Sequence, residues 1–375
     1  MNSQNQLFLL LSLFLILHFS GQRLMLEVEG NEVNDAPKKM FVFGDSYADT
    51  GNIRKSLSNS WKEPYGVTFP GKPAGRFSDG RVLTDYIGSA IFVGTTKNIY
   101  FVTFLAMYMK VKSPVPYRLR KLMPQHLKYG INFAVGGTGV FDTLTGGPNM
   151  TTQIDLFEQV IKDKVYTASD FNTSVALVSI AGNDYSHYLA TNGSTQQFEL
   201  FMQGLPSFVA SVINQTTTNL IRIKGLGVKK IVVGGLQPLG CLPQMTATFS
   251  FQQCNNTTND LVLLHNNLLT QVVTTLNQQT NDHSSFIVLN LYDSFMSVLN
   301  HPSTHHIQNQ LKPCCVGVSS ESFCGSVDEK NVKKYKVCDD PKSAFFWDLV
   351  HPTQAGWHAV YNKLRTMNVL QQIYY

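Results

Sequence analysis

A serine near one end of the chain and an Asp–His pair near the other have the chemistry of a nucleophilic catalyst. The segment FVFGDSYADTGN (41–52) presents Ser46 after a short apolar run, and FWDLVHPT (346–353) presents Asp348 three residues before His351. A serine hydroxyl is a weak nucleophile at neutral pH, and it needs a base to take its proton and a third group to orient that base. The sequence therefore predicts that Ser46 attacks, His351 moves the proton and Asp348 orients the imidazole.

Two other groups of residues compete for these roles. Asp184 and His187 have the same spacing and also follow a predicted strand, but no proline follows their histidine, and we expect His351 to be the base. The segment HPSTHH (301–306) supplies three histidines, but Val298 stands three residues before the first of them, so that no acid orients it. No Cys or carboxylate completes a metal-ligand set there. We therefore expect neither a second triad nor a metal site.

The tetrahedral intermediate of acyl transfer carries an oxyanion, which fixed hydrogen-bond donors must stabilise. The candidate donors are the backbone N–H of Ser46, the N–H of a glycine in GGTG (136–139) and the side-chain amide of Asn183. Glycine suits the second position because the backbone must approach the substrate closely there. The same GGTG segment is no phosphate loop, since no G-K-[ST] follows it.

Short apolar runs precede these residues and are expected to position them. The runs do not alternate between apolar and polar residues, as is typical of strands that are covered on both faces. Strands that alternate with helices predict a doubly wound parallel sheet, whose ligands bind beyond the carboxyl ends of the strands. Pro352 would begin the closing helix, where its missing N–H costs nothing. The predicted strands are 39–43, 131–135, 175–180, 229–235 and 286–290, and the predicted helices include 152–165, 198–227 and 259–279.

The motifs resemble those of the plant GDSL, or SGNH, esterase/lipase family over nearly all of the mature chain. One such motif alone would be weak, but six in the family's order are highly specific. They are FGDSYADTGN (43–52), GRFSDGRVLTDYI (75–87), NFAVGGTG (132–139), GND (182–184), LGCLP (239–243) and FWDLVHPT (346–353).

The resemblance implies a three-layer α/β/α, flavodoxin-like hydrolase with a mainly parallel five-stranded sheet. Among the glycines it points to Gly137 as the oxyanion donor, with Gly136 as the alternative. Tyr47 stands where the family usually has leucine, a departure that we expect to be tolerated. The resemblance maps the catalytic residues onto Ser46, Asp348 and His351, and the oxyanion hole onto Ser46, Gly137 and Asn183.

Several features of the sequence predict export from the cell. The apolar stretch 7–19 suits a signal peptide covering 1–22, or ending as late as about 30, and it is short for a membrane-anchoring helix. The even number of cysteines is consistent with disulfides in an oxidising compartment. Sequons for N-glycosylation occur at Asn149, Asn172, Asn192, Asn214, Asn255 and Asn256. We therefore predict a secreted glycoprotein of the apoplast or cell wall.

All six cysteines lie in the last 135 residues. Cys241 and Cys254 are close in sequence and flank a loop, so we expect them to pair. The other four allow three connectivities that the sequence cannot separate. They are Cys314, Cys315, Cys324 and Cys338.

We expect one hydrolase domain over 36–370, with an atypical apolar insertion at 91–110. Relatives pass almost directly from one flank of this insertion to the other. Its longest apolar run, 99–109, is too short to span a bilayer. Two explanations are left: a flap that binds lipid, or a translated intron or faulty gene model. We favour the second explanation.

The net charge of +5 is modest for 375 residues, and nothing in the sequence resembles a nucleic-acid-binding module. The predicted activity is that of a monomeric, secreted serine esterase or lipase that needs no metal or organic cofactor. Its substrate is a small-molecule, lipid or cell-wall ester, which the sequence does not specify further. The alternatives are an acyltransferase, in which an alcohol resolves the same acyl-serine, and a non-catalytic secreted binding protein.

Overall fold

A computed structural model of the chain describes residues 37–93, 113–192, 198–280 and 284–373. The predicted signal peptide (1–22) lies outside the described residues, as do residues 94–110 of the predicted insertion. The first residues of that insertion, 91–93, belong to a helix that begins at Leu83.

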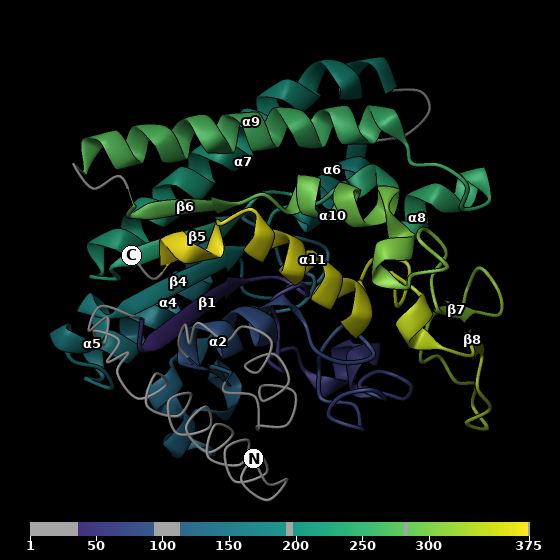
Figure 1. Ribbon diagram of the computed structural model, residues 1–375, viewed down its shortest axis with the longest axis horizontal. Helices are drawn as coiled ribbons and strands as arrows, with labels where there is room; N and C mark the ends of the chain where they lie inside the picture. Colours follow the sequence, from purple (N-terminus) through teal and green to yellow (C-terminus); the bar gives the residue numbers. More distant parts are fainter. Residues whose placement is uncertain (1–36, 94–112, 193–197, 281–283, 374–375) are drawn as a thin grey trace, which may run out of the picture. The chain divides into compact units, whose positions relative to one another are not determined.

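A parallel sheet of six strands lies at the centre of the described chain (Figure 1). Its order is β2-β3-β1-β4-β5-β6, and every neighbouring pair is parallel. Without the edge strand β2, this order is the one of flavodoxin-like folds, which confirms the predicted fold class. The strands are β1 (Lys39–Gly44), β2 (Val115–Pro116), β3 (Ile131–Asn132), β4 (Ser174–Ser179), β5 (Lys230–Gly234) and β6 (Phe286–Leu289).

The predicted sheet of five strands was wrong by one strand. β2 has only two residues, so it leaves no apolar run that could be recognised in the sequence. The predicted strand 131–135 is also shorter, because β3 ends at Asn132. The backbone nevertheless continues beside β1, since the N–H groups of Phe133 and Val135 donate to β1 carbonyls at 2.7 and 3.0 Å.

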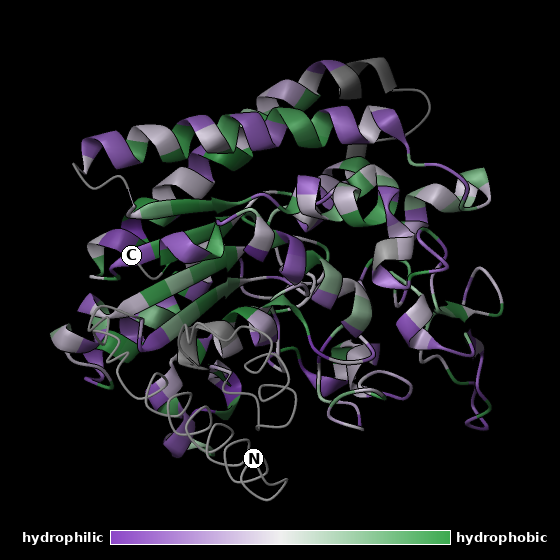
Figure 2. Ribbon diagram, in the orientation of Figure 1, coloured by the Kyte–Doolittle hydropathy of each residue, from purple (hydrophilic) through white to green (hydrophobic). Residues whose placement is uncertain are grey.

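The strands are apolar because helices cover both faces of the sheet. All six residues of β4 are buried, and the hydropathy colouring shows the central strands as mostly hydrophobic (Figure 2). Aromatic rings from β1 fill the core beside α4. The ring centroid of Phe41 lies 4.7 Å from that of Phe157, and the ring of Phe43 stacks on that of Phe133 with the centroids 5.4 Å apart. This rigid core supports the carboxyl ends of the strands, where the candidate residues lie.

The helices form two groups. In one group α4 contacts β1, α7 contacts β5 and α9 contacts β6, and in the other α11 contacts both α2 and α10. Figure 1 shows α11 crossing in front of the sheet. The helices are α2 (Leu83–Val93), α4 (Met150–Lys162), α5 (Ala168–Asn172), α6 (Gly182–Asn192), α7 (Phe198–Gly225), α8 (Pro243–Thr246), α9 (Asn256–Gln279), α10 (Leu291–Asn300) and α11 (Gln354–Thr366).

The closing helix α11 differs from the prediction at its start. Pro352 does not begin this helix, because it precedes the N-cap residue and forms a β-bridge with Phe346. The cap is Thr353, whose hydroxyl accepts a hydrogen bond of 2.9 Å from the Gly356 N–H. Since β-region geometry continues up to the cap, His351 lies in the connection before the helix rather than on its first turn.

A small antiparallel pair of strands, β7 (Cys315–Gly317) and β8 (Tyr335–Val337), precedes the segment that carries Asp348. Two disulfides join this arm internally, Cys314–Cys338 and Cys315–Cys324. The third bridge is Cys241–Cys254, the pair expected from the sequence.

Candidate active site

Ser46 lies in the turn that follows β1. Gly44 ends this strand with φ of +153°, and a Cβ there would lie 2.1 Å from the carbonyl oxygen of Ser179 on β4. Only glycine therefore allows the two strands to approach so closely at this point. The Asp49 N–H then donates to the Asp45 carbonyl at 2.9 Å and closes the turn. The result is a tight connection that places Ser46 at the carboxyl edge of the sheet.

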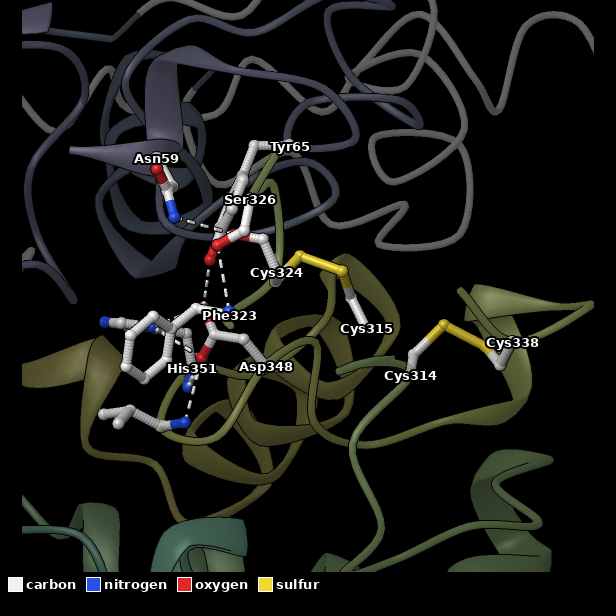
Figure 3. The surroundings of a disulfide bond; sticks show 11 residues. Asn59, Tyr65, Cys314, Cys315, Phe323, Cys324, Ser326, Cys338, Asp348 and His351 are labelled. Carbon is white, nitrogen blue, oxygen red and sulfur yellow. Dashed lines mark hydrogen bonds and ion pairs between the residues drawn. A yellow bond between two sulfur atoms is a disulfide. The ribbon is translucent and has the colours of Figure 1, made fainter. Parts of the chain in front are cut away.

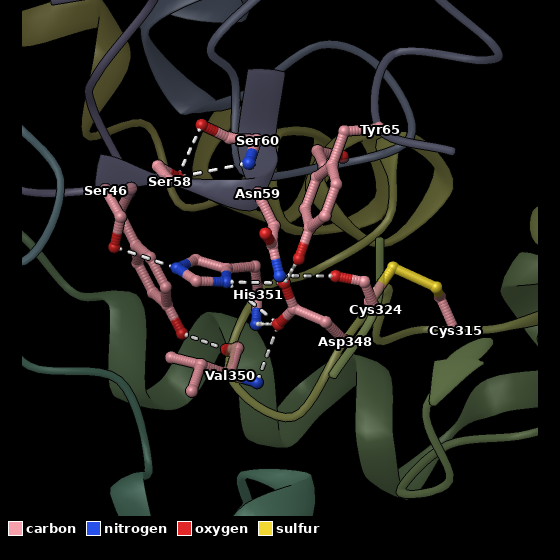
Figure 4. Close-up of polar contacts among 12 residues, drawn as sticks. Ser46, Ser58, Asn59, Ser60, Tyr65, Cys315, Cys324, Asp348, Val350 and His351 are labelled. Carbon is pink, nitrogen blue, oxygen red and sulfur yellow. Dashed lines mark hydrogen bonds and ion pairs between the residues drawn. A yellow bond between two sulfur atoms is a disulfide. The ribbon is translucent and has the colours of Figure 1, made fainter. Parts of the chain in front are cut away.

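The structure brings Ser46, His351 and Asp348 into one chain of hydrogen bonds (Figure 4). The Ser46 Oγ lies 2.8 Å from His351 Nε2, and His351 Nδ1 lies 2.8 and 2.9 Å from the two oxygens of Asp348. An ionised carboxylate only accepts hydrogen bonds, so Nδ1 donates to Asp348, and Nε2 is left to accept from the serine hydroxyl. This geometry can activate a serine for attack on a carbonyl carbon.

Asp348 is buried, yet its surroundings favour the ionised form. Burial by itself would raise the pKa of Asp348, but the charge and hydrogen bond of His351, together with other donors, hold this pKa below its usual value. The other donors are the Val350 N–H at 2.9 Å and the His351 N–H at 2.8 Å, both to Oδ1, and the Tyr65 hydroxyl at 2.7 Å to Oδ2.

Tyr47, the residue that departs from the family pattern, also contacts this group. Its hydroxyl donates to the Val350 carbonyl at 2.8 Å, and its ring lies edge-on to His351 with the centroids 5.7 Å apart. The tyrosine thus ties the Ser46 turn to the loop that carries Asp348 and His351, a link that leucine could not make.

Two backbone N–H groups near Ser46 are available to an oxyanion. In the described part of the chain, neither the Ser46 N–H nor the Gly137 N–H has a hydrogen-bond acceptor. The N–H of Gly136, the alternative donor, is already engaged, since it donates to Asp49 Oδ2 at 3.0 Å. Asn183, at the start of α6, donates one amide hydrogen to the Thr138 carbonyl at 2.9 Å and keeps a second one.

Asp49 organises this region, a role that the sequence reasoning missed. Its Oδ1 accepts from the N–H groups of Gly51 and Asn52 at 2.7 and 2.6 Å, and its Oδ2 accepts from Ile53 and Gly136, each at 3.0 Å. One buried carboxylate therefore connects the loop after Ser46 to the loop that carries Gly137. A signal was present, because Asp49 lies directly before a small turn in DTGN.

Gln153 on α4 adds a second link of this kind. Its Oε1 accepts from the Gly44 N–H at 2.8 Å, and its Nε2 donates to the Gly44 carbonyl at 3.0 Å and the Thr138 hydroxyl at 3.2 Å. Gln153 thus connects the end of β1 to the glycine-rich loop. A signal was present, because Gln153 is a polar residue in the apolar stripe of this helix, with Ile154 and Phe157, whereas Gln159, the other glutamine of α4, is exposed.

The competing histidines do not form a comparable group. Asp184 directs its two oxygens to the N–H groups of Val140 and Phe141 at 2.8 and 2.9 Å. Within the described residues, the buried Nδ1 of His187 has no hydrogen-bond partner. The described part of the chain also holds no cluster of three or more His, Cys, Asp or Glu residues that could bind a metal ion, and this includes the segment 301–306.

The disulfide arm supports the segment before Asp348. Cys315 donates its N–H to the carbonyl of Trp347 at 2.6 Å. The Cys324 carbonyl accepts from Asn59 Nδ2 at 3.1 Å, which ties the Cys315–Cys324 bridge to the loop that carries Tyr65 (Figure 3). The Cys315–Cys324 bridge thus connects two loops that meet at the Asp348 carboxylate.

None of the described helices is both long and apolar enough to cross a membrane.

Comparison with known proteins identifies relatives that match most of this chain. The family model for GDSL-like lipase/acylhydrolase matches residues 40–364. A GDSL esterase/lipase of Arabidopsis thaliana is 53% identical over 349 residues, which cover 90% of this chain and 90% of that protein. A second Arabidopsis GDSL esterase/lipase is 47% identical over 369 residues, which cover 95% of this chain and 96% of that protein.

Among solved structures, an acetylxylan esterase from Geobacillus stearothermophilus aligns with a TM-score of 0.36 and 13% identity, covering 90% of this chain and 94% of that chain. The family match spans most of the sequence, and both Arabidopsis relatives align over nearly their full length. The chain therefore belongs to the GDSL-like lipase/acylhydrolase family.

Proposed function

We propose that this protein is a secreted serine hydrolase of carboxylic esters, with Ser46 as nucleophile, His351 as base and Asp348 as the acid that orients it. The observation that carries this proposal is the hydrogen-bonded chain from Ser46 Oγ to the Asp348 carboxylate. It lies beside the N–H groups of Ser46 and Gly137, which have no acceptor in the described part of the chain. Family membership supports the same reaction class.

The first half of the reaction forms an acyl-serine. Ser46 Oγ attacks the ester carbonyl while His351 Nε2 takes the hydroxyl proton, and Asp348 stabilises the resulting imidazolium. The N–H groups of Ser46 and Gly137 and the amide of Asn183 donate to the oxyanion. His351 then gives its proton to the leaving alkoxide, and the alcohol departs.

The second half releases the acid. Water enters the place that the alcohol has left, and His351 takes one of its protons as the oxygen attacks the acyl carbon. Collapse of the second tetrahedral intermediate breaks the bond to Ser46 Oγ, which regains its proton from His351. These steps need no group beyond the side chains and backbone already named.

The surroundings of His351 contribute to the substrate site. The centroid of the Phe77 ring lies 4.9 Å from that of the His351 imidazole. A Cβ at Gly136 would collide with the Phe77 ring, so the ring also borders the glycine-rich loop. Phe77 thus forms an apolar wall between the base and the glycine-rich loop. We propose that the acyl or alcohol group of a small-molecule, lipid or cell-wall ester packs against this wall, and that a monomer suffices for activity.

The proposal of secretion is supported by the predicted signal peptide and by the cysteines, all of which are bridged. The sequons differ in their surroundings. Asn172, Asn214 and Asn256 are exposed, whereas Asn149 Nδ2 donates to Asp142 at 2.8 Å. We therefore propose that Asn172, Asn214 and Asn256 are glycosylated.

The proposed activity is tested with purified protein and p-nitrophenyl esters of increasing chain length, followed by acetylated polysaccharide and cutin-like esters. Hydrolysis by the wild-type protein and its loss in Ser46→Ala would support the proposal. Equal rates in the two proteins would refute it. Addition of an alcohol distinguishes hydrolysis from acyl transfer. An acyltransferase would form a new ester with the alcohol faster than it releases free acid.

A further inference from the structure

Tyr65 lies beside the catalytic carboxylate but belongs to a distant part of the sequence. It is buried, and its hydroxyl lies 2.7 Å from Asp348 Oδ2 across a separation of 283 residues. Its ring packs edge-on against Trp347, with the centroids 6.0 Å apart. Figure 4 shows the phenol approaching Asp348 from the side opposite to Val350.

The hydroxyl of Tyr65 donates this hydrogen bond. Burial and the nearby charge of Asp348 raise the pKa of Tyr65 well above its usual value, so the phenol keeps its proton. The ionised carboxylate can only accept. The contact is therefore a charge-assisted hydrogen bond, which is stronger than a bond between neutral groups.

The donors to Asp348 divide between its two oxygens. Oδ1 accepts from the backbone N–H groups of Val350 and His351, which belong to its own loop. Apart from the imidazole, the donor to Oδ2 in the described structure is Tyr65. The local loop thus fixes one oxygen, and a residue from the other end of the chain fixes the other. Together they prevent rotation of the carboxylate about its Cβ–Cγ bond.

The loop of Tyr65 is itself anchored to the disulfide arm. Asn59 Nδ2 donates to the Cys324 carbonyl at 3.1 Å, and Cys324 is bridged to Cys315 (Figure 3). Cys315 in turn pairs with the backbone of Trp347, next to Asp348. The phenol and the carboxylate are therefore held by one connected set of contacts.

We propose that Tyr65 is a positioning residue of the triad. Its hydroxyl holds the Asp348 carboxylate in the plane of the His351 ring, and it reduces the negative charge that the carboxylate presents to the imidazole. This inference rests on the proposed function, since it assigns a role within that reaction. A purely structural role is the alternative, because a buried tyrosine hydroxyl needs some hydrogen-bond partner. The two explanations differ in their effect on kcat and on the pH profile.

The decisive variant is Tyr65→Phe, which removes one oxygen and keeps the ring. A misaligned carboxylate orients the base less well, so we expect kcat to fall about tenfold at unchanged KM. Without the phenol, more negative charge faces His351 and stabilises its protonated form. The acid limb of the kcat/KM profile should therefore move to higher pH.

Tyr335→Phe provides a matched control. Tyr335 is buried in the same side-chain cluster as Tyr65, and no described hydrogen bond joins its hydroxyl to Asp348 or His351. This variant should keep the wild-type kcat and pH profile. If both variants lose activity equally, or if Tyr65→Phe lowers the melting temperature without changing kcat or the acid limb, the positioning role is wrong.

A double-mutant cycle shows whether Tyr65 acts through Asp348. In an Asp348→Asn background, Tyr65→Phe should change the residual kcat by less than about twofold, because the carboxylate is already gone. An undiminished tenfold loss would overturn the proposal.

A second substitution covers the case in which Tyr65→Phe does not fold. Incorporation of 3-fluorotyrosine at position 65 keeps the hydroxyl and makes it a stronger donor, so the acid limb should shift to lower pH. A shift in the other direction, or none, would contradict the proposal. If the wild-type protein itself hydrolyses no ester, the proposed function fails, whereas an active wild type with silent Tyr65 variants removes only the positioning role.

Discussion

The backbone N–H of Gly136 donates a 3.0 Å hydrogen bond to Oδ2 of Asp49, a carboxylate 87 residues earlier in the chain. This contact engages the N–H of Gly136 and leaves the next amide, that of Gly137, without an acceptor in the described part of the chain. Gly137 adopts φ of +81°, a conformation that favours glycine. We therefore infer that the Asp49 side chain sets the orientation of the proposed donor, Gly137.

Asp49→Asn tests this dependence. The asparagine keeps Oδ1 as the acceptor for the N–H groups of Gly51 and Asn52, and its NH₂ group replaces Oδ2. Two donors would then face each other at Gly136, so the glycine-rich loop should shift. We expect kcat to fall about tenfold or more. This fall should be smaller than the fall in kcat caused by removing an oxyanion donor. Asp142→Asn, at an exposed carboxylate on the neighbouring loop, should match the wild type in the same assay. An Asp49→Asn enzyme with unchanged kcat would show that this hydrogen bond does not position Gly137.

Asn183→Ala removes a proposed oxyanion donor. The loss should lower kcat by about 10²–10³-fold with little change in KM, because the amide acts mainly in the transition state. Ser186→Ala, an exposed position on the same helix, is the control and should remain active. A large rise in KM at unchanged kcat would instead assign Asn183 to substrate binding.

His351→Gln and His187→Gln separate the two D-x-x-H pairs. His351 bonds to both Ser46 and Asp348, so its replacement should lower kcat to nearly the level of Ser46→Ala, since triad members act as a unit. His187 lies outside this chain of hydrogen bonds, and its variant should keep most of the activity. Steady-state kinetics with the opposite outcome would show that the assigned base is wrong.

These tests concern residues that the sequence revealed to different degrees. Ser46, Asp348 and His351 could be proposed from the sequence because each lies in a short motif with recognisable chemistry, and the structure joins them by hydrogen bonds. The choice of Gly137 over Gly136 came from the family resemblance and remains a prediction, which the hydrogen bond from Gly136 to Asp49 supports. Local patterns thus identify reactive groups, but they do not identify what holds them.

The missed features all depend on contacts between distant segments. Tyr65 donates to Asp348 from 283 residues away, and no local pattern marks it. The two-residue strand β2 exists only because β3 pairs with it. Cys314 and Cys315 are adjacent, so spacing could not decide that they bridge to Cys338 and Cys324 respectively. Tertiary structure supplies each of these answers.

Asp45, next to the nucleophile, should make stability depend on pH. Burial raises the pKa of Asp45 to about 7, although the Tyr47 N–H and the charge of His351 act in the opposite direction. A carboxyl whose pKa is raised on folding favours its protonated form in the native state. Its contribution is therefore fully present below the unfolded value of about 4 and is lost as the pH rises through about 7.

Asp45→Asn removes this dependence and serves as the probe. Relative to the wild type, the variant should gain stability between pH 4 and pH 8, by roughly 4 kcal/mol at most for a shift of about three pH units. Denaturant unfolding of both proteins at several pH values measures the difference. A constant difference across this range would mean that Asp45 does not titrate on folding.

The central claim is that Ser46 is an activated nucleophile, and covalent labelling tests it most directly. Purified protein is treated with a fluorophosphonate, and the modified peptide is identified by mass spectrometry. We expect one added phosphonyl group on Ser46, fast labelling of the wild type, and much slower labelling of His351→Gln. A protein that hydrolyses esters but carries its label on another residue, or that remains unlabelled, would contradict the claim.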